Sequence, residues 1–164
     1  MLVWSKRYAI GIPRLDADHV TLVSLLNQLY INLAEEKCGD AIDPILAALQ
    51  QYADSHFRFE ESLMTEFGYP ELEAHQESHD GFSIRIAELR REHHANGDVA
   101  RSLRTLLGRW LFDHVVRVDG RLGKWLNANR ITVPGIPGLP STPSLPNGRR
   151  PVLNAPLEFR AGRA

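Results

Sequence analysis

Five histidines and two carboxylates stand at positions where a helical protein would normally place apolar side chains. They occur in four separate stretches of the chain: His19; His56 and Glu60; His75 and His79; His114 and Asp119. A buried ionised carboxylate is costly unless it is paired, hydrogen-bonded or bound to a metal. Burial of all seven side chains at one level of a small domain would therefore require a compensating cation.

The spacing within these stretches indicates that the side chains converge. Residues four apart on an α-helix are separated by about 40° around its axis, so His56 and Glu60 point to one side together, as do His75 and His79. A separation of five residues, like that of the last pair, is about 140° on an ideal helix. If that pair also binds metal, the helix must deviate, and we predict a π-bulge, a wide turn or a similar distortion within it.

The number of donors indicates two metal ions rather than one. Three imidazoles would bind one ion and two the other, while both carboxylates and a solvent-derived oxide or hydroxide bridge the pair. The first ion would be bound by His75, His79 and His114, and the second by His19 and His56. The bridging carboxylates would be Glu60 and Asp119. The first ion would have six ligands and the second five, which leaves one position open for a small exogenous ligand. Imidazole combined with carboxylate suits iron, with manganese or zinc as substitutes.

Four amphipathic helices separated by short loops are expected to position these side chains. Apolar residues recur every three or four positions over about residues 16–37, 44–67, 70–96 and 99–129. Asp16 or Asp18 is expected to cap the first helix, Pro44 to open the second and Gly68 to end it. The sequence shows no strand alternation and no glycine-rich phosphate loop. It predicts an all-α protein, an antiparallel up-down-up-down four-helix bundle with an N-terminal arm.

The composition changes near residue 131, which divides the chain into a bundle (1–130) and a tail (131–164). Seven of the ten prolines lie in these last 34 residues. A proline at every third position from Pro134 to Pro146 excludes a helix and favours an extended or disordered tail. We expect a flexible or loosely docked segment; the alternative is a docking segment for a protein partner or for self-association.

Composition excludes several classes of protein. A net charge of −1 over 164 residues gives no general attraction to nucleic acid or to an anionic membrane. No apolar run is long enough to span a membrane, and the N-terminus lacks the order of a signal peptide. A single cysteine, Cys38, excludes an internal disulfide framework. We therefore expect a cytoplasmic protein.

The charge of the site distinguishes it from oxygen-activating di-iron bundles. Those bundles carry four glutamates and two histidines in paired Glu-x-x-His motifs, and no such motif occurs here at inward positions. With fewer anionic donors, a high-valent oxidised metal should be less stabilised. Reversible binding of dioxygen is then favoured over oxidation of a strong bond.

The order of these motifs resembles the pattern of the hemerythrin family. The similarity to bacterial single-domain members is clearest in HFRFEESLMTEFGYPELEAHQESHDGF, which begins at His56, and extends to LDADH and RWLFDH, which end at His19 and His114. It covers roughly residues 1–130 and all seven ligand positions. The resemblance implies a non-haem di-iron centre that binds dioxygen at the open iron.

The resemblance also implies an apolar dioxygen pocket. Its residues, carried over position by position, are Leu22, Phe57, Trp110, Leu111 and Val115. Asp18 departs from the pattern, because bacterial members often have glutamine there. We expect Asp18 to face solvent; the alternative is a contact with an imidazole. His93 and His94 lie outside the pattern and are expected at the surface.

The sequence thus predicts a protein that binds dioxygen reversibly at two bridged iron ions, for carriage, storage, delivery or sensing, and not an enzyme. Three alternatives stay open. The same site could serve a di-iron oxidase, peroxidase or nitric-oxide-handling enzyme. The metal could be structural while the tail binds a partner. Iron storage or scavenging would need labile iron.

Overall fold

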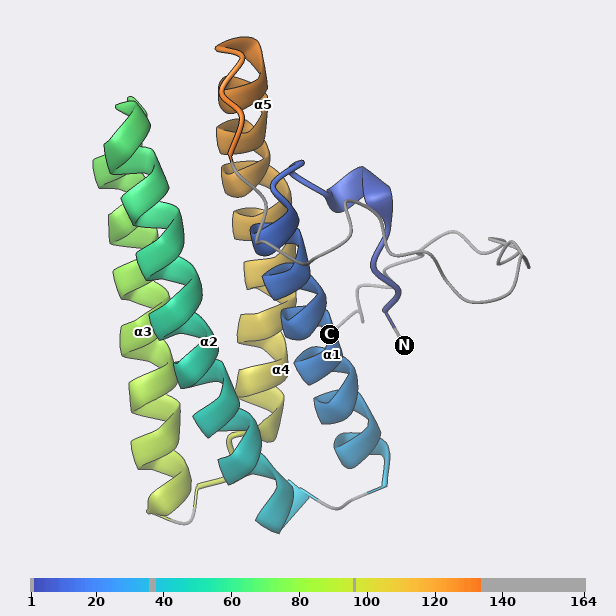
Figure 1. Ribbon diagram of the computed structural model, residues 1–164. Helices are drawn as coiled ribbons and strands as arrows, with labels where there is room; N and C mark the ends of the chain where they lie inside the picture. The colour runs from blue at the N-terminus through green and yellow to red at the C-terminus, as the bar shows by residue number, and fades with distance from the viewer. Residues whose placement is uncertain (1, 36–37, 96, 134–164) are drawn as a thin grey trace, which may run out of the picture.

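The computed structural model describes residues 2–35, 38–95 and 97–133, and within these ranges every regular element is helical (Figure 1). The elements in chain order are the 3₁₀ turn η1 (Lys6–Tyr8), α1 (Pro13–Ala34), α2 (Cys38–Phe67), α3 (Leu72–His94), α4 (Ala100–Arg109), the π-helix η2 (Trp110–Asp119) and α5 (Gly120–Ala128). The segments α4, η2 and α5 follow one another without a break and form one column beside the other three helices. Successive columns run in opposite directions, so the predicted four-helix bundle is confirmed.

The start of α1 differs from the predicted cap. Pro13 occupies the first turn, and Ile12 precedes it without a side-chain capping bond. The carboxylate of Asp16 instead accepts hydrogen bonds from the backbone N–H groups of Ile10, at 2.8 Å, and Gly11, at 3.2 Å. The expectation that Asp16 or Asp18 caps this helix is therefore wrong. The two hydrogen bonds of Asp16 connect the N-terminal arm to α1.

The second helix begins at Cys38, so Pro44 lies inside it rather than at its first position, and the predicted start is wrong. Proline removes one backbone hydrogen bond. Packing offsets this loss, because Ile42, just before the proline, is 2% exposed and belongs to the core. The predicted end is confirmed: Gly68 has a φ of +68°, and the N–H of Tyr69 donates to the carbonyl of Met64 at 2.9 Å.

The predicted distortion of the fourth column is confirmed. The π-helix η2 spans ten residues and contains both His114 and Asp119. In π geometry each N–H bonds to the carbonyl five residues back, so residues five apart lie near the same face. The extra residue per turn brings both side chains inward.

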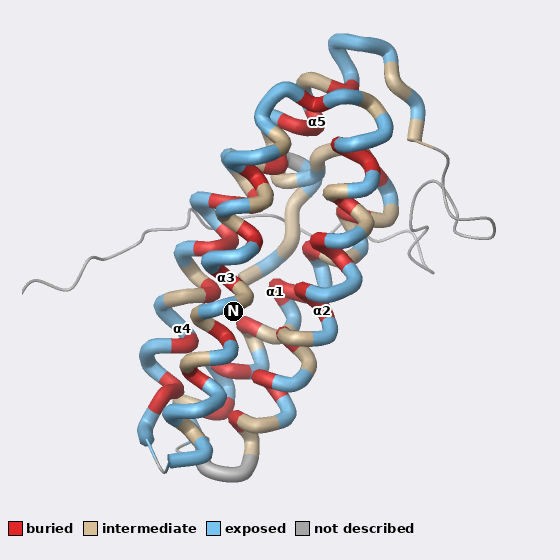
Figure 2. Tube along the Cα trace, turned by 90° about the vertical axis from the view of Figure 1, so that its left-hand side faces the viewer, coloured by how far each residue is buried: buried red, intermediate tan, exposed pale blue. Residues whose placement is uncertain are grey.

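Buried residues follow the inward sides of the helices along the length of the bundle (Figure 2). The apolar ones form two parts, and a layer of buried polar residues lies between them. The larger part, here called the lower core, includes Leu26, Leu49, Phe82 and Leu103. The smaller part, the upper core, lies toward the α5 end of the bundle in Figure 1 and includes Leu15, Met64, Leu122 and Leu126. The polar layer is thus shielded from both ends of the bundle.

The N-terminal arm lies along α1. Its backbone at Leu2 exchanges two hydrogen bonds with the amide of Asn27, each 2.7 Å long. At its other end the carbonyl oxygen of Ile10 would lie 2.6 Å from a Cβ placed on Gly123. Glycine at that position of α5 is what permits the close approach.

Two further predictions concern the proline-rich tail and membrane-spanning helices. Residues 134–164, which form nearly all of the proline-rich tail, lie outside the described residues, so the division at residue 131 stays a prediction. Within the described part of the chain, no helix has the length and apolar character needed to cross a membrane.

Candidate metal centre

All seven predicted ligands are buried in the layer between the two cores. None of these residues is more than 2% exposed. They come from every column of the bundle: His19 from α1, His56 and Glu60 from α2, His75 and His79 from α3, and His114 and Asp119 from η2. The structure therefore brings together every residue that the spacing singled out.

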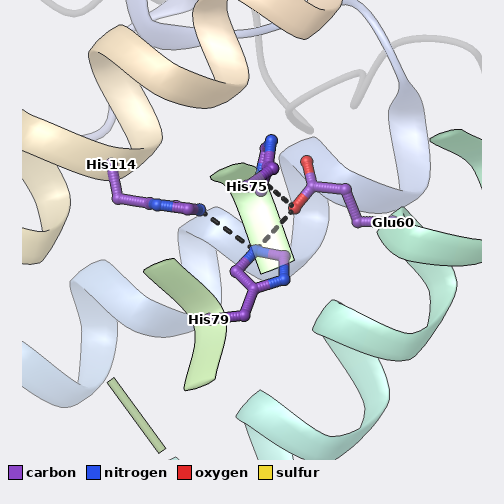
Figure 3. Close-up of side chains that lie close together, drawn as sticks. All are labelled: Glu60, His75, His79 and His114. Atoms are coloured by element: carbon purple, nitrogen blue, oxygen red, sulfur yellow. Dashed lines mark hydrogen bonds and ion pairs between the residues drawn. The ribbon is translucent and has the colours of Figure 1, made fainter. Parts of the chain in front are cut away.

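The donor atoms form two groups. One ligand atom from each of Glu60, His75, His79 and His114 lies within 4.8 Å of the others (Figure 3). We call these residues the four-donor cluster. His19, His56 and Asp119 meet the same criterion and form the three-donor cluster. This division matches the predicted sharing of the imidazoles between two ions.

Each carboxylate lies between the clusters. Asp119 places Oδ1 3.1 Å from His114 Nε2 and Oδ2 3.1 Å from His19 Nε2. Glu60 places Oε2 3.4 Å from His79 Nε2 and 3.7 Å from His56 Nε2. Both carboxylates are therefore placed where they could bridge two cations.

The residues fit a metal ion better than they fit one another. The buried atoms without a hydrogen-bond partner include both oxygens of Glu60 and Asp119 and the Nε2 atoms of His19, His56 and His75. Leaving buried polar atoms unpaired is expensive, and a cation among them would remove that cost. Imidazole and carboxylate together suit iron among the biological metals.

Without a metal, the two carboxylates and the imidazoles stabilise one another as ion pairs. Burial and the charge of Asp119 oppose ionisation of Glu60, but ion-pair contacts with His75 and His79, 3.5 and 3.4 Å from its Oε2, outweigh them and lower its pKa from 4.5 to about 2. Burial alone would lower the pKa of His75, yet ion-pair contacts of its Nε2 with Asp119 and Glu60, at 3.3 and 3.5 Å, raise it from 6.5 to about 9. The metal-free site is therefore a protonated imidazole held between two carboxylates.

Three residues outside the predicted set contact the outer nitrogens of the ligands. Asp18 Oδ2 lies 3.3 Å from His56 Nδ1, so the expectation that Asp18 faces solvent is wrong and the alternative contact is observed. Glu61 Oε1 lies 2.8 Å from His79 Nδ1. The two contacts place a carboxylate behind one imidazole of each cluster.

The third such contact comes from Ser78, whose hydroxyl lies 2.9 Å from His114 Nδ1. Sequence reasoning missed Ser78 and Glu61, although a signal was present. Like Asp18, each directly adjoins a predicted ligand and contacts a histidine of the neighbouring helix. One step along a helix turns the side chain by about 100°, from the interior to the seam between two helices.

Aromatic rings fix the orientation of three ligands. Phe57 stacks on His79 with ring centroids 3.9 Å apart, and Trp110 stacks on His114 at 3.8 Å. Tyr52 stacks on His56 at 4.9 Å, with 17° between the ring planes. Burial, with the nearby carboxylates of Asp119 and Glu60, raises the pKa of Tyr52 well above its ordinary value, so the phenol stays protonated.

The residues expected to line a dioxygen pocket all belong to the lower core. They are Leu22, Phe57, Trp110, Leu111 and Val115, and each is buried. His93 and His94 lie outside both clusters. His93 is half-buried, whereas His94 is exposed and pairs with Asp43 at 2.9 Å.

Comparison with known proteins assigns a family to this arrangement. Residues 10–126 match the family described as the hemerythrin HHE cation binding domain. The chain is 39% identical over 118 residues to a bacteriohemerythrin of Stenotrophomonas maltophilia, covering 70% of this chain and 74% of that protein. A bacteriohemerythrin of Pseudomonas aeruginosa is 38% identical over 118 residues, with coverages of 72% and 76%. A bacteriohemerythrin of Methylococcus capsulatus is 29% identical over 134 residues, with coverages of 78% and 98%.

Proposed function

The chain belongs to the hemerythrin family, and on that premise we propose that it binds dioxygen reversibly at two iron ions held by the seven buried donors. The observation that carries the proposal is the pair of clusters, with two carboxylates placed between them and unpaired buried atoms facing inward. The family implies iron, and the donor set suits it. Bound iron would supply the electrons by which dioxygen is held.

The division of donors supports a vacant position at one ion only. The four-donor cluster contributes three imidazoles and the three-donor cluster two. If both carboxylates and one solvent-derived oxide or hydroxide were shared, an ion at the three-donor cluster would have one ligand fewer. We propose that dioxygen enters there.

The walls beside the site support binding rather than turnover. The proposed pocket residues are apolar over most of their surface and belong to one continuous core cluster. Such walls keep water and protons away from the bound ligand, which slows oxidation of the iron. The site also contains only two carboxylates among its seven donors, fewer than the four glutamates of oxygen-activating bundles. A carrier, store, donor or sensor of oxygen would use the same reversible step.

The decisive experiment combines metal analysis with visible absorption. Purified protein should contain two irons per chain. Exposing the reduced protein to air should produce an absorption band, and removing the oxygen should abolish it over repeated cycles. Rapid conversion to the oxidised form with release of peroxide would instead support a di-iron oxidase or peroxidase. A protein that contains only zinc, or that gives no response to air, would contradict the proposal.

A further inference from the structure

One layer of side chains lies directly below the metal-binding residues. Because α1 and α3 run downward in Figure 1 while α2 and the α4–η2 column run upward, a residue just after a ligand on the first two helices meets one just before a ligand on the others. The layer consists of Leu22, three residues after His19; Tyr52, four before His56; Phe82, three after His79; and Trp110, four before His114. All four belong to the lower core.

The rings of this layer touch in sequence around Phe57. Tyr52 lies 6.4 Å from Phe57 between ring centroids, and Trp110 lies 5.6 Å from it on the other side. Trp110 and Phe82 are 4.3 Å apart. Tyr52 thus belongs to one aromatic wall together with Phe57, Phe82 and Trp110.

Tyr52 differs from the rest of this wall because it carries a hydroxyl. The residue is 6% exposed, and its hydroxyl oxygen is buried and has no hydrogen-bond partner among the described residues. A buried hydroxyl without an acceptor is costly. Phenylalanine would fill the same space without that cost, as Phe57 and Phe82 do beside it.

The position of Tyr52 associates it with the three-donor cluster. Its ring stacks on the imidazole of His56, which belongs to that cluster. The indole N–H of Trp110 is also unpaired, but that ring stacks on His114 of the four-donor cluster. The phenol is therefore the unpaired donor associated with the ion that keeps a vacant position in the proposed function.

We propose that the Tyr52 hydroxyl donates a hydrogen bond to the small ligand that binds beside the three-donor cluster. This inference rests on the proposed function. It makes Tyr52 a specificity-determining residue, which favours ligands that can accept a hydrogen bond in an otherwise apolar pocket.

The test is the binding of azide to the oxidised, iron-loaded protein, with Tyr52→Phe compared with wild type. The variant should keep two irons per chain and bind azide about tenfold more weakly, the effect of losing one hydrogen bond to a charged acceptor. The infrared stretching frequency of bound azide should shift between H₂O and D₂O in wild type and not in the variant. The thermal midpoint of the metal-free variant should equal or exceed that of wild type, because the hydroxyl makes no bond in the protein.

Tyr69→Phe is the matched control. Tyr69 is also buried and its ring lies 6.4 Å from that of His75, but it belongs to the upper core on the other side of the metal layer. Its replacement should leave azide affinity unchanged within about twofold, a change of only a few tenths of a kcal/mol.

Three results would overturn the inference: azide affinity of Tyr52→Phe as close to wild type as that of the control, an isotope shift that persists in the variant, or a variant that loses iron or melts earlier, which would indicate a structural bond. If wild type binds azide and dioxygen and Tyr52→Phe does so equally well, only this inference fails. If iron-loaded wild type binds neither ligand, the proposed function fails and the inference falls with it.

Discussion

The two donor clusters are equally buried but are supported differently. In the four-donor cluster, His79 and His114 have polar partners behind them at 2.8 and 2.9 Å. Among the described residues, the only such partner in the three-donor cluster is Asp18, at 3.3 Å from His56, and one imidazole of each cluster, that of His19 or His75, leaves its Nδ1 without a hydrogen-bond partner. Partners behind a ligand fix its orientation and increase its basicity. From these shorter contacts we predict that the four-donor cluster would hold a metal ion more firmly than the three-donor cluster.

The largest expected effect follows from removing a carboxylate that both clusters share. Glu60→Ala should lose iron from both clusters, because it removes a donor that the two proposed ions would share. Elemental analysis should find much less than one iron per chain, with no absorption band in air. Glu66→Ala, which changes an exposed glutamate of the same helix, should keep both ions. Retention of two irons by Glu60→Ala would contradict the assigned ligand set.

The next effect concerns the metal-free four-donor cluster. Because the pKa of His75 is raised from 6.5 to about 9 by Asp119 and Glu60, its protonated form stabilises the fold. That contribution is complete below about pH 6.5 and is lost as the pH rises through about 9, with at most about 3 kcal/mol at stake. Chemical denaturation of the metal-free protein between pH 6 and pH 10 would measure it.

The affinity for iron should change with pH in the opposite direction to the stability of the metal-free fold. A protonated imidazole cannot bind metal, so iron affinity should rise over the interval in which the metal-free fold weakens. The Glu60 carboxylate works in the acidic range: its pKa of about 2 means that its contribution is present above pH 4.5 and lost as the pH falls toward 2. A metal-free protein whose stability rises steadily from pH 6 to pH 9 would contradict the ion-pair description.

The smallest effects should separate the supports of the two clusters. Glu61→Gln should weaken iron binding by about tenfold to a hundredfold, measured as the rate of iron release to a chelator. Asp18→Asn should weaken it by less than about tenfold, because its contact with the imidazole is longer, at 3.3 Å against 2.8 Å. Glu77→Gln, an exposed change on α3, should release iron at the wild-type rate. Equal rates for the first two variants would remove the proposed difference between the clusters.

The sequence was sufficient to predict the bundle and the seven buried donors, because both depend on periodicity. A separation of four places His56 beside Glu60, and the separation of five between His114 and Asp119 made a distorted helix necessary. The structure confirms that distortion as a π-helix. Patterns within a single helix are visible in a single sequence.

Contacts between helices were not predictable in the same way. The partners of His79 and His114 depend on how neighbouring helices are rotated against each other, and no spacing along the chain records this rotation. The start of α2 was misplaced because Pro44 is usually a first-turn residue, whereas burial of Ile42 extends the helix past it. Nothing in the sequence distinguishes Tyr52, since the lack of an acceptor for its hydroxyl becomes visible only when its surroundings are known.

The π-helix has a consequence for residues far from the metal layer. The wider turns of the π-helix change the direction in which the later side chains of the same column point. The apolar side chains of α5 face the upper core with this rotation included. If η2 were an ordinary α-helix of the same length, α5 would be turned about the axis of the column by about 100°, the rotation of one residue. Leu122 and Leu126 would turn toward water, and Gly123 would no longer face Ile10. Loss of the π geometry would thus detach the N-terminal arm from α5 and misdirect Asp119 together, so both depend on the same backbone irregularity.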